Sequence, residues 1–121
     1  VTYGANLWRC VAAAEELASS GIEAEIVDLR SLRPLDDATI LASLRRTRRA
    51  VIVDEGWRTG SLAAEIAMRI VEQGFYDLDA PIARVCTEEV PIPYPLHLEQ
   101  AALPGPERIV AAVRRLFGHA D

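Results

Sequence analysis

Asp54 and Glu55 are the residues best placed for chemistry, because they follow a short apolar run at residues 50–53 and precede a glycine-containing loop at residues 56–61. Carboxylates at the end of a buried strand can bind Mg²⁺, and the first of the two could accept a phosphoryl group. A phosphoacceptor of the receiver kind needs a positioned cation, normally Lys, and this chain has no Lys. We therefore expect Asp54 or Glu55 to bind backbone N–H groups of the loop or to pair with Arg58.

The loop at residues 56–61 leads into a helical pattern, so its N–H groups could hold an anion. Its glycine spacing matches neither a P-loop nor a dinucleotide-binding fingerprint, and an N-cap at Thr59 or Ser61 is the simpler interpretation. A stand-alone α/β module that binds a phosphorylated small ligand at the Thr59–Ser61 helix N-terminus stays open as the alternative function. Trp57 and Arg58 are interface candidates, because Trp and Arg recur at the centres of protein interfaces.

No other set of residues completes an active site. His97 and His119 are the only histidines, and neither has a second ligand or a nucleophile near it in the sequence. Cys10 and Cys86 lie far apart in apolar settings, outside any CxxC arrangement, which predicts two reduced, inert thiols in a cytoplasmic protein. We expect no catalytic residue in this domain, and no cofactor or metal bound by it.

The composition is that of one globular domain. The chain has 121 residues, of which 50% are hydrophobic and 26% charged, enough for one hydrophobic core. A net charge of −5 argues against nucleic acid as a partner, and no apolar run approaches the ~20 residues that span a bilayer.

All thirteen basic residues are Arg. Four of them, Arg45, Arg46, Arg48 and Arg49, lie at the C-terminal end of a predicted helix, where the helix dipole favours cations. A phosphate site there is the less favoured interpretation.

The elements that must position these residues alternate between strand and helix. Hydrophobic spacing and turn residues predict strands at residues 1–3, 22–29, 50–53 and 81–86. Helices are predicted at residues 6–20, from Asp36 or Asp37 onward, from residue 62 to just before Gly74, and at residues 107–117, with Asn6 and Asp36 or Asp37 as N-caps. Such an order predicts a three-layer α/β/α sandwich in a single domain, residues 1–121.

A stiff extended arm is predicted at residues 88–95, because Pro91, Pro93 and Pro95 fix the backbone at alternate positions. The interleaved Val90, Ile92 and Tyr94 are typical of residues that pack on a neighbouring surface, which makes Tyr94 a further interface candidate. A proline-rich ligand for a small adaptor domain is the less favoured alternative. A short helical turn is expected at residues 96–103.

Four blocks of the chain, at residues 26–36, 53–60, 78–85 and 90–94, occur in an order that resembles the transketolase C-terminal domain as found in the beta subunit of pyruvate dehydrogenase. That protein is the thiamine-diphosphate-dependent, decarboxylating component of a 2-oxo acid dehydrogenase complex. The block at residues 56–60, Gly-Trp-Arg-Thr-Gly, is closer to the pyruvate branch of the family. Residues 84–86, Arg-Val-Cys, are closer to the branched-chain 2-oxo acid branch, so the substrate stays open.

The resemblance implies a five-stranded, mixed but mostly parallel sheet with one antiparallel strand, in a fragment of a longer beta subunit whose first strand begins before Val1. It implies that thiamine diphosphate and Mg²⁺ bind elsewhere, between the alpha subunit and the N-terminal domain of the beta subunit. The domain itself would be inactive alone and would help to assemble a heterotetramer with the alpha subunits and a second beta subunit.

The resemblance also implies that this domain docks the subunit-binding domain of the dihydrolipoyl acyltransferase. The docking carboxylate of the family falls on Asp79, and Asp77, beside Phe75 and Tyr76, would complete an acidic patch with aromatic anchors for a basic partner. The other contact of the family is the end of the polypeptide, which falls near Phe117 although this chain extends past it to Asp121.

Overall fold

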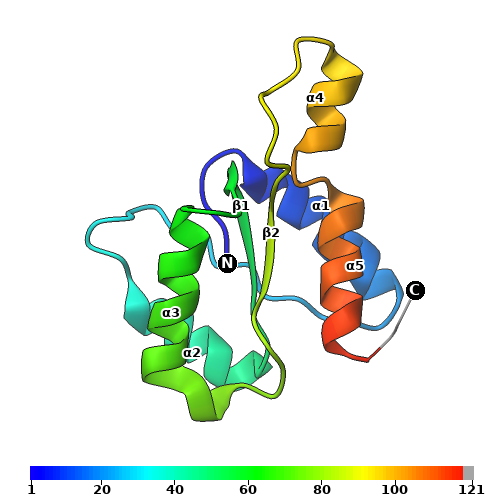
Figure 1. The fold of residues 1–121 in the computed structure, drawn as a ribbon. Helices are drawn as coiled ribbons and strands as arrows, with labels where there is room; N and C mark the ends of the chain where they lie inside the picture. Colours follow the sequence, from blue (N-terminus) through cyan, green and yellow to red (C-terminus); the bar gives the residue numbers. More distant parts are fainter. Residues whose placement is uncertain (119–121) are drawn as a thin grey trace.

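Helices surround a short central sheet in the computed structural model, which describes residues 1–118 (Figure 1). The elements in order are α1 (Asn6–Ser19), α2 (Asp37–Thr47), β1 (Val51–Trp57), α3 (Leu62–Gly74), the 3-10 helix η1 (Phe75–Asp77), β2 (Ala83–Thr87), α4 (Leu96–Ala102) and α5 (Pro106–Leu116). Every predicted helix is present, and its ends lie within a few residues of the prediction. None of these helices is long and apolar enough to cross a bilayer.

The sheet is built from two parallel strands, β1 and β2, which pair from Val51 opposite Ala83 to Asp54 opposite Cys86. Two extended segments, residues 1–3 and residues 27–29, lie beyond β1 and are joined to it and to each other by a few backbone hydrogen bonds. The Val53 N–H donates to the carbonyl of Val1 at 3.0 Å, and the Thr2 N–H donates to the carbonyl of Val27 at 2.9 Å. Main chain at residues 27–29, residues 1–3, β1 and β2 therefore lies side by side.

The expected five-stranded mixed sheet is not confirmed, because the described residues form a sheet of two strands, both parallel. The strand predicted at residues 22–29 is absent, and its only bridge joins Asp28 to Thr2. Within the described residues, the Ile22 N–H donates to the Leu17 carbonyl of α1 at 3.0 Å, and hydrogen bonding to the segment at Thr2 begins only at Val27. The antiparallel strand is missing as well; the one antiparallel bridge in residues 1–118 joins Leu32 to Leu35 in a connector.

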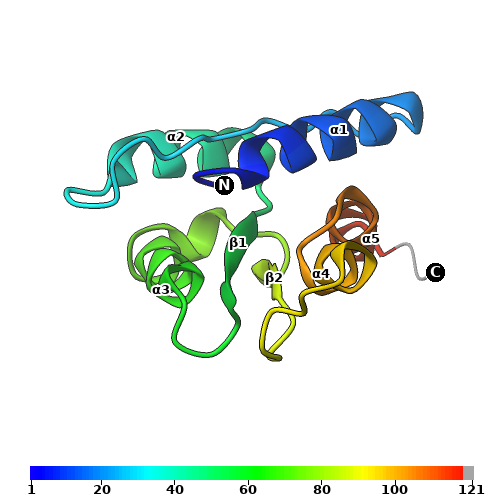
Figure 2. The ribbon, with the colours of Figure 1, turned by 90° about the horizontal axis from the view of Figure 1, so that it is seen from above.

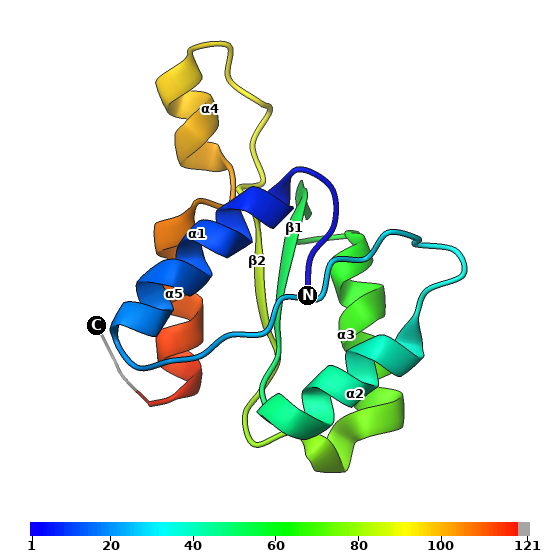
Figure 3. The same ribbon diagram turned by 180° about the vertical axis from the view of Figure 1, so that it is seen from behind.

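Neighbouring residues of β1 face opposite sides of the sheet, as the pleat requires. Ile52, which is 0% exposed, packs in a core cluster with residues of α2 and α3, whereas Val53 packs with residues of α1 and α5. Figure 2 shows α3 and α5 on opposite sides of β1 and β2, and the view from behind shows α1 beside α5 and α2 beside α3 (Figure 3). This is the three-layer arrangement that the sequence predicts.

The two predicted N-caps have different outcomes. The Asp36 side chain accepts from the Thr39 N–H at 3.0 Å at the start of α2, as predicted, and hydrogen bonds from Thr39 lower the pKa of Asp36. The Asn6 prediction is wrong, because Ala5 occupies the cap position of α1. Asn6 instead lies buried in the first turn, where its Oδ1 accepts from Nη1 of Arg9 at 2.8 Å.

Gly74 ends α3 where this helix meets α2, and the contact leaves no room for a side chain. A Cβ atom at this position would lie 2.8 Å from Cδ2 of Leu44 and 3.0 Å from Cδ2 of Leu41. We expect Gly74→Ala to lower the free energy of unfolding by about 1–2 kcal/mol, because the buried Leu44 must move. Urea unfolding measures the change. Glu72→Ala, at an exposed position of the same helix, is the control; a Gly74→Ala variant as stable as this control would contradict the tight helix contact.

Candidate functional site

Asp54 is buried in the middle of β1, at the last residue before its pairing with β2 shifts, and both of its carboxylate oxygens accept backbone hydrogen bonds. The Gly56 N–H donates to Oδ1 at 2.7 Å and the Ala63 N–H donates to Oδ2 at 3.2 Å. The second bond reaches the first turn of α3, where Ser61 occupies the cap position without a side-chain cap hydrogen bond. Asp54 therefore does from a distance what a capping side chain normally does. The prediction that a carboxylate binds the loop is confirmed, and the prediction of a Thr59 or Ser61 side-chain cap is wrong.

Glu55 and Arg58, on either side of Gly56 and Trp57, bind other elements of the structure. Glu55 pairs with Arg9 of α1 at 2.9 Å and not with Arg58, as the sequence had allowed. Arg58 donates from Nη1 to the carbonyl of Arg84 at 3.1 Å, and Nη1 of Arg84 donates back to the carbonyl of Arg58 at the same distance. Arg58 therefore ties the loop after β1 to β2.

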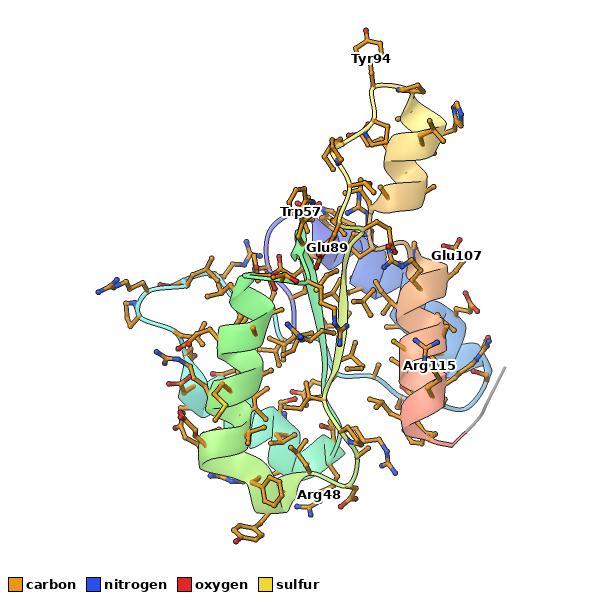
Figure 4. The ribbon with its side chains drawn as sticks, viewed as in Figure 1. Arg48, Trp57, Glu89, Tyr94, Glu107 and Arg115 are labelled. Atoms are coloured by element: carbon orange, nitrogen blue, oxygen red, sulfur yellow. The ribbon has the colours of Figure 1, made fainter. Side chains whose placement is uncertain are left out.

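Two backbone donors around the start of α3 are engaged by carboxylates of this chain. Asp54 binds the first turn of α3, and Glu89 accepts from the Thr59 N–H at 2.9 Å. Hydrogen bonds from the Thr59 side chain and backbone lower the pKa of Glu89. This arrangement argues against the alternative function, a phosphorylated-ligand site from Thr59 to Ser61. Trp57 lies half-exposed at the same end of the molecule as Glu89 (Figure 4).

The acidic turn, defined here as residues 75–79, is held by arginines at the end of α2. Arg48 donates from Nη1 to Asp77 Oδ1 at 3.0 Å, from Nη2 to Asp79 Oδ1 at 3.2 Å and from Nη2 to the Tyr76 carbonyl at 3.0 Å. Nε of Arg45 lies 3.5 Å from Asp77 Oδ2. The two predicted docking carboxylates are therefore brought together as expected, but two guanidinium groups balance their charge.

Phe117 lies next to the same end of α2. The guanidinium of Arg49 stacks over the Phe117 ring, 4.3 Å from its centroid, and Nε of Arg49 donates to the Leu116 carbonyl at 3.1 Å. Since Arg48 and Arg49 are consecutive, they connect the acidic turn and the end of α5 to one end of α2. Sequence reasoning missed this role, because a basic run after a helix is already explained by the helix dipole.

The predicted arm projects beyond the sheet and is closed at its base. The Glu88 N–H donates to the Ala102 carbonyl at 2.9 Å, and Arg108 of α5 donates to the carbonyls of Cys86 at 2.8 Å and Leu103 at 3.1 Å. The tip is open, and the Tyr94 side chain is fully exposed. Figure 4 shows Tyr94 pointing away from the body, at the end opposite Arg48.

An open apolar groove of about 820 Å³ runs along α3 beside the acidic turn. Its walls are mostly apolar side chains of α3 and of the segment that leads to β2, with Asp79 and Arg84 as its charged lining residues; the apolar residues include Ala67, Met68, Phe75, Leu78 and Ile82. Met68 and Phe75 are at least half-exposed. A second protein could bury both side chains here.

Within residues 1–118, the histidine and the two cysteines lie in separate parts of the structure. His97 is exposed on α4, and His119 lies outside the described residues. Cys10 and Cys86 are buried free thiols in core clusters on opposite faces of the sheet, and burial raises the pKa of both. Within residues 1–118, no three His, Cys, Asp or Glu side chains gather as metal ligands.

Comparison with known proteins identifies proteins that are similar to nearly the full length of this chain. A family model described as the transketolase C-terminal domain matches residues 1–109. The pyruvate dehydrogenase E1 component subunit beta-1, mitochondrial, of Arabidopsis thaliana is 48% identical over 115 residues, which cover 95% of this chain and 32% of that protein. The corresponding beta subunit of Drosophila melanogaster is 50% identical over 107 residues, covering 88% and 29%.

Two further similar proteins extend this comparison. The acetoin:2,6-dichlorophenolindophenol oxidoreductase subunit beta of Cupriavidus necator is 44% identical over 115 residues, covering 95% of this chain and 34% of that protein. A solved structure described as a split gene transketolase, inactive beta4 tetramer, matches with a TM-score of 0.83 and 26% identity, covering 97% of this chain and 38% of that chain. This chain therefore spans about a third of the length of the proteins it matches.

The buried carboxylate of Asp54 supports a direct test of how the loop is held. In Asp54→Asn, an amide NH₂ must face one of the two backbone donors, so one buried hydrogen bond is lost. We expect the free energy of unfolding to fall by about 1–3 kcal/mol, and hydrogen exchange at Gly56 or Ala63 to speed up. Glu72→Gln, at an exposed position of α3, is the control. Equal urea midpoints for both variants would show that the carboxylate does not hold the loop.

Proposed function

Because the chain belongs to the transketolase C-terminal domain family, we propose that it is the C-terminal assembly and docking domain of the beta subunit of a thiamine-diphosphate-dependent 2-oxo acid dehydrogenase. Identity of 48% and 50% to two pyruvate dehydrogenase E1 beta subunits, over 95% and 88% of the chain, carries the proposal. Pyruvate is the proposed substrate of the parent enzyme, which decarboxylates it oxidatively and passes the acyl group to lipoyl groups.

The domain's proposed role in this reaction is non-catalytic. Mg²⁺ binds oxygen ligands, and the strongest candidate is Asp54, whose buried carboxylate already uses both oxygens to hold the backbone of Gly56 and Ala63. Glu55 is paired with Arg9. Thiamine diphosphate and Mg²⁺ are accordingly assigned to other parts of the parent enzyme, between the alpha subunit and the N-terminal domain of the beta subunit.

Two separate surfaces suit two kinds of partner. The half-exposed Trp57 and the fully exposed Tyr94 mark the end with the arm, which we assign to assembly with the alpha subunits and the second beta subunit. The acidic turn and Phe117, near Arg48 at the opposite end (Figure 4), are assigned to the subunit-binding domain of the dihydrolipoyl acyltransferase. Because the two ends are far apart, a partner on one end does not block the other.

A cytoplasmic location is part of the proposal. Its support is the pair of buried, free cysteines on opposite faces of the sheet, since reduced thiols are typical of proteins from reducing compartments.

The proposed division of labour predicts that this 121-residue chain alone neither decarboxylates pyruvate nor binds thiamine diphosphate. The chain should nevertheless be required in the complete enzyme, where a beta subunit that lacks it should fail to form the heterotetramer with alpha subunits. Dye-reduction assays with pyruvate, titration calorimetry with thiamine diphosphate and Mg²⁺, and size-exclusion chromatography measure the three properties. Turnover by the chain alone, or full assembly without it, would overturn the proposal.

The docking assignment predicts that Asp79→Ala in the assembled enzyme weakens binding of the acyltransferase's subunit-binding domain by about 1–3 kcal/mol, because one member of a partly desolvated charge pair is removed. Surface plasmon resonance at several salt concentrations measures the change. Asp28→Ala, which removes an acidic residue that pairs with Arg30 away from the turn, is the control. Unchanged affinity and unchanged salt dependence for Asp79→Ala would refute the docking assignment.

A further inference from the structure

We propose that Arg48 is a positioning residue for the docking surface: it holds Asp79 at the border of the apolar groove so that one carboxylate oxygen meets a cation of the partner. The inference rests on the docking role proposed above. It adds a residue outside the acidic turn, and it separates the roles of the two aspartates.

Arg48 holds Asp79 through both its backbone and its side chain. The Asp79 N–H donates to the Arg48 carbonyl at 2.8 Å. From the side chain, Nε and Nη2 of Arg48 donate to Oδ1 of Asp79 at 3.3 and 3.2 Å. Two attachments of this kind fix the position of the aspartate backbone and the orientation of its carboxylate.

The two aspartates use their oxygens differently. Asp77 has both oxygens engaged, Oδ1 by Arg48 at 3.0 Å and Oδ2 by Arg45 at 3.5 Å. For Asp79 only Oδ1 is engaged; within residues 1–118, Oδ2 accepts no hydrogen bond. Asp77 is therefore an internal support that orients Arg48, and Asp79 is the aspartate that offers an acceptor to a second protein.

The conformation of Arg48 shows how firmly the contact is built. Arg48 ends α2 with φ of 60°, the left-handed conformation that residues other than Gly adopt at a cost. Its guanidinium contacts three acceptors that come from Tyr76, Asp77 and Asp79. A planar group with five donors can serve all of them at once, which a Lys ammonium group cannot do in the same geometry.

The surroundings define the chemistry of the partner. Asp77 and Asp79 are balanced by Arg45 and Arg48, so long-range attraction of a highly basic surface is not the main selective force. Asp79 lines the groove together with the exposed Met68 and with Arg84, whose Nη1 donates to the Arg58 carbonyl. The surface therefore fits a partner segment that combines one Arg or Lys, directed at Asp79, with an apolar side chain that enters the groove.

The test measures how Arg48 and Asp79 act together in the assembled enzyme. Binding of the acyltransferase's subunit-binding domain is measured by surface plasmon resonance for Arg48→Asn, Asp79→Ala and the double variant. Asn tolerates φ near 60°, so Arg48→Asn removes the guanidinium while keeping a residue that suits the backbone. Arg69→Gln is the matched control, because Arg69 also lies between two carboxylates, those of Asp37 and Glu65, away from the acidic turn.

We expect Arg48→Asn to weaken binding by about five-fold to ten-fold, which corresponds to about 1 kcal/mol. The double variant should bind no more weakly than Asp79→Ala alone, because a positioning residue acts through the group it positions. Arg69→Gln should bind like the unmodified enzyme, and thermal melting should show that Arg48→Asn remains folded.

Several outcomes overturn the proposal. If Asp79→Ala weakens binding and a folded Arg48→Asn binds normally or more tightly, Arg48 does not position the carboxylate, while the docking function stands. Additive effects in the double variant, or an equal loss in Arg69→Gln, would likewise rule out a positioning role for Arg48. If Asp79→Ala itself has no effect, the docking function and the positioning role both fall.

Discussion

The structure depends on one buried carboxylate that is shared between a strand and a helix. Asp54 lies in the middle of β1 and is 3% exposed, and its oxygens accept from Gly56 and from Ala63 in the first turn of α3. A buried charge is tolerated only when hydrogen bonds replace the water it has lost. Because helix N-termini present N–H groups that lack intrahelical partners, each side of this contact satisfies the other, and the chain between Gly56 and the start of α3 is fixed at both ends.

The opposite end of the molecule depends on two consecutive arginines. Arg48 reaches the acidic turn, and Arg49 reaches Phe117 and the Leu116 carbonyl of α5. Segments separated by about forty residues in the sequence are thus held around the end of α2. The planar guanidinium suits this task because it donates in several directions at once and also stacks on an aromatic ring.

The sequence allowed correct prediction of those elements whose signal is local. The helices and β1 follow from hydrophobic spacing and turn residues, and the Asp36 cap follows from residue type at the start of a periodic segment. The strand predicted at residues 22–29 was wrong, because a strand needs a neighbouring strand to pair with, and only residues 27–29 bond to the extended segment at Thr2. Asn6 looked like a cap by residue type, but its position one residue inside the helix is set by the turn before it.

The candidate site was predictable only in part for the same reason. The acidic turn was found through its resemblance to a family. The role of Arg48 depends on partners at positions 77 and 79, which no local pattern connects with it.

The arm has a mechanical consequence for the domain. Its backbone is stiffened by alternating prolines, and its base is tied to α5 and to the carbonyl of Cys86 by Arg108. Because these hydrogen bonds join the base of the arm to α5, a force on Tyr94 acts on α5 as well as on the arm. The other end of α5 is hydrogen-bonded to Arg49, so α5 connects the tip of the arm with the opposite end of the molecule.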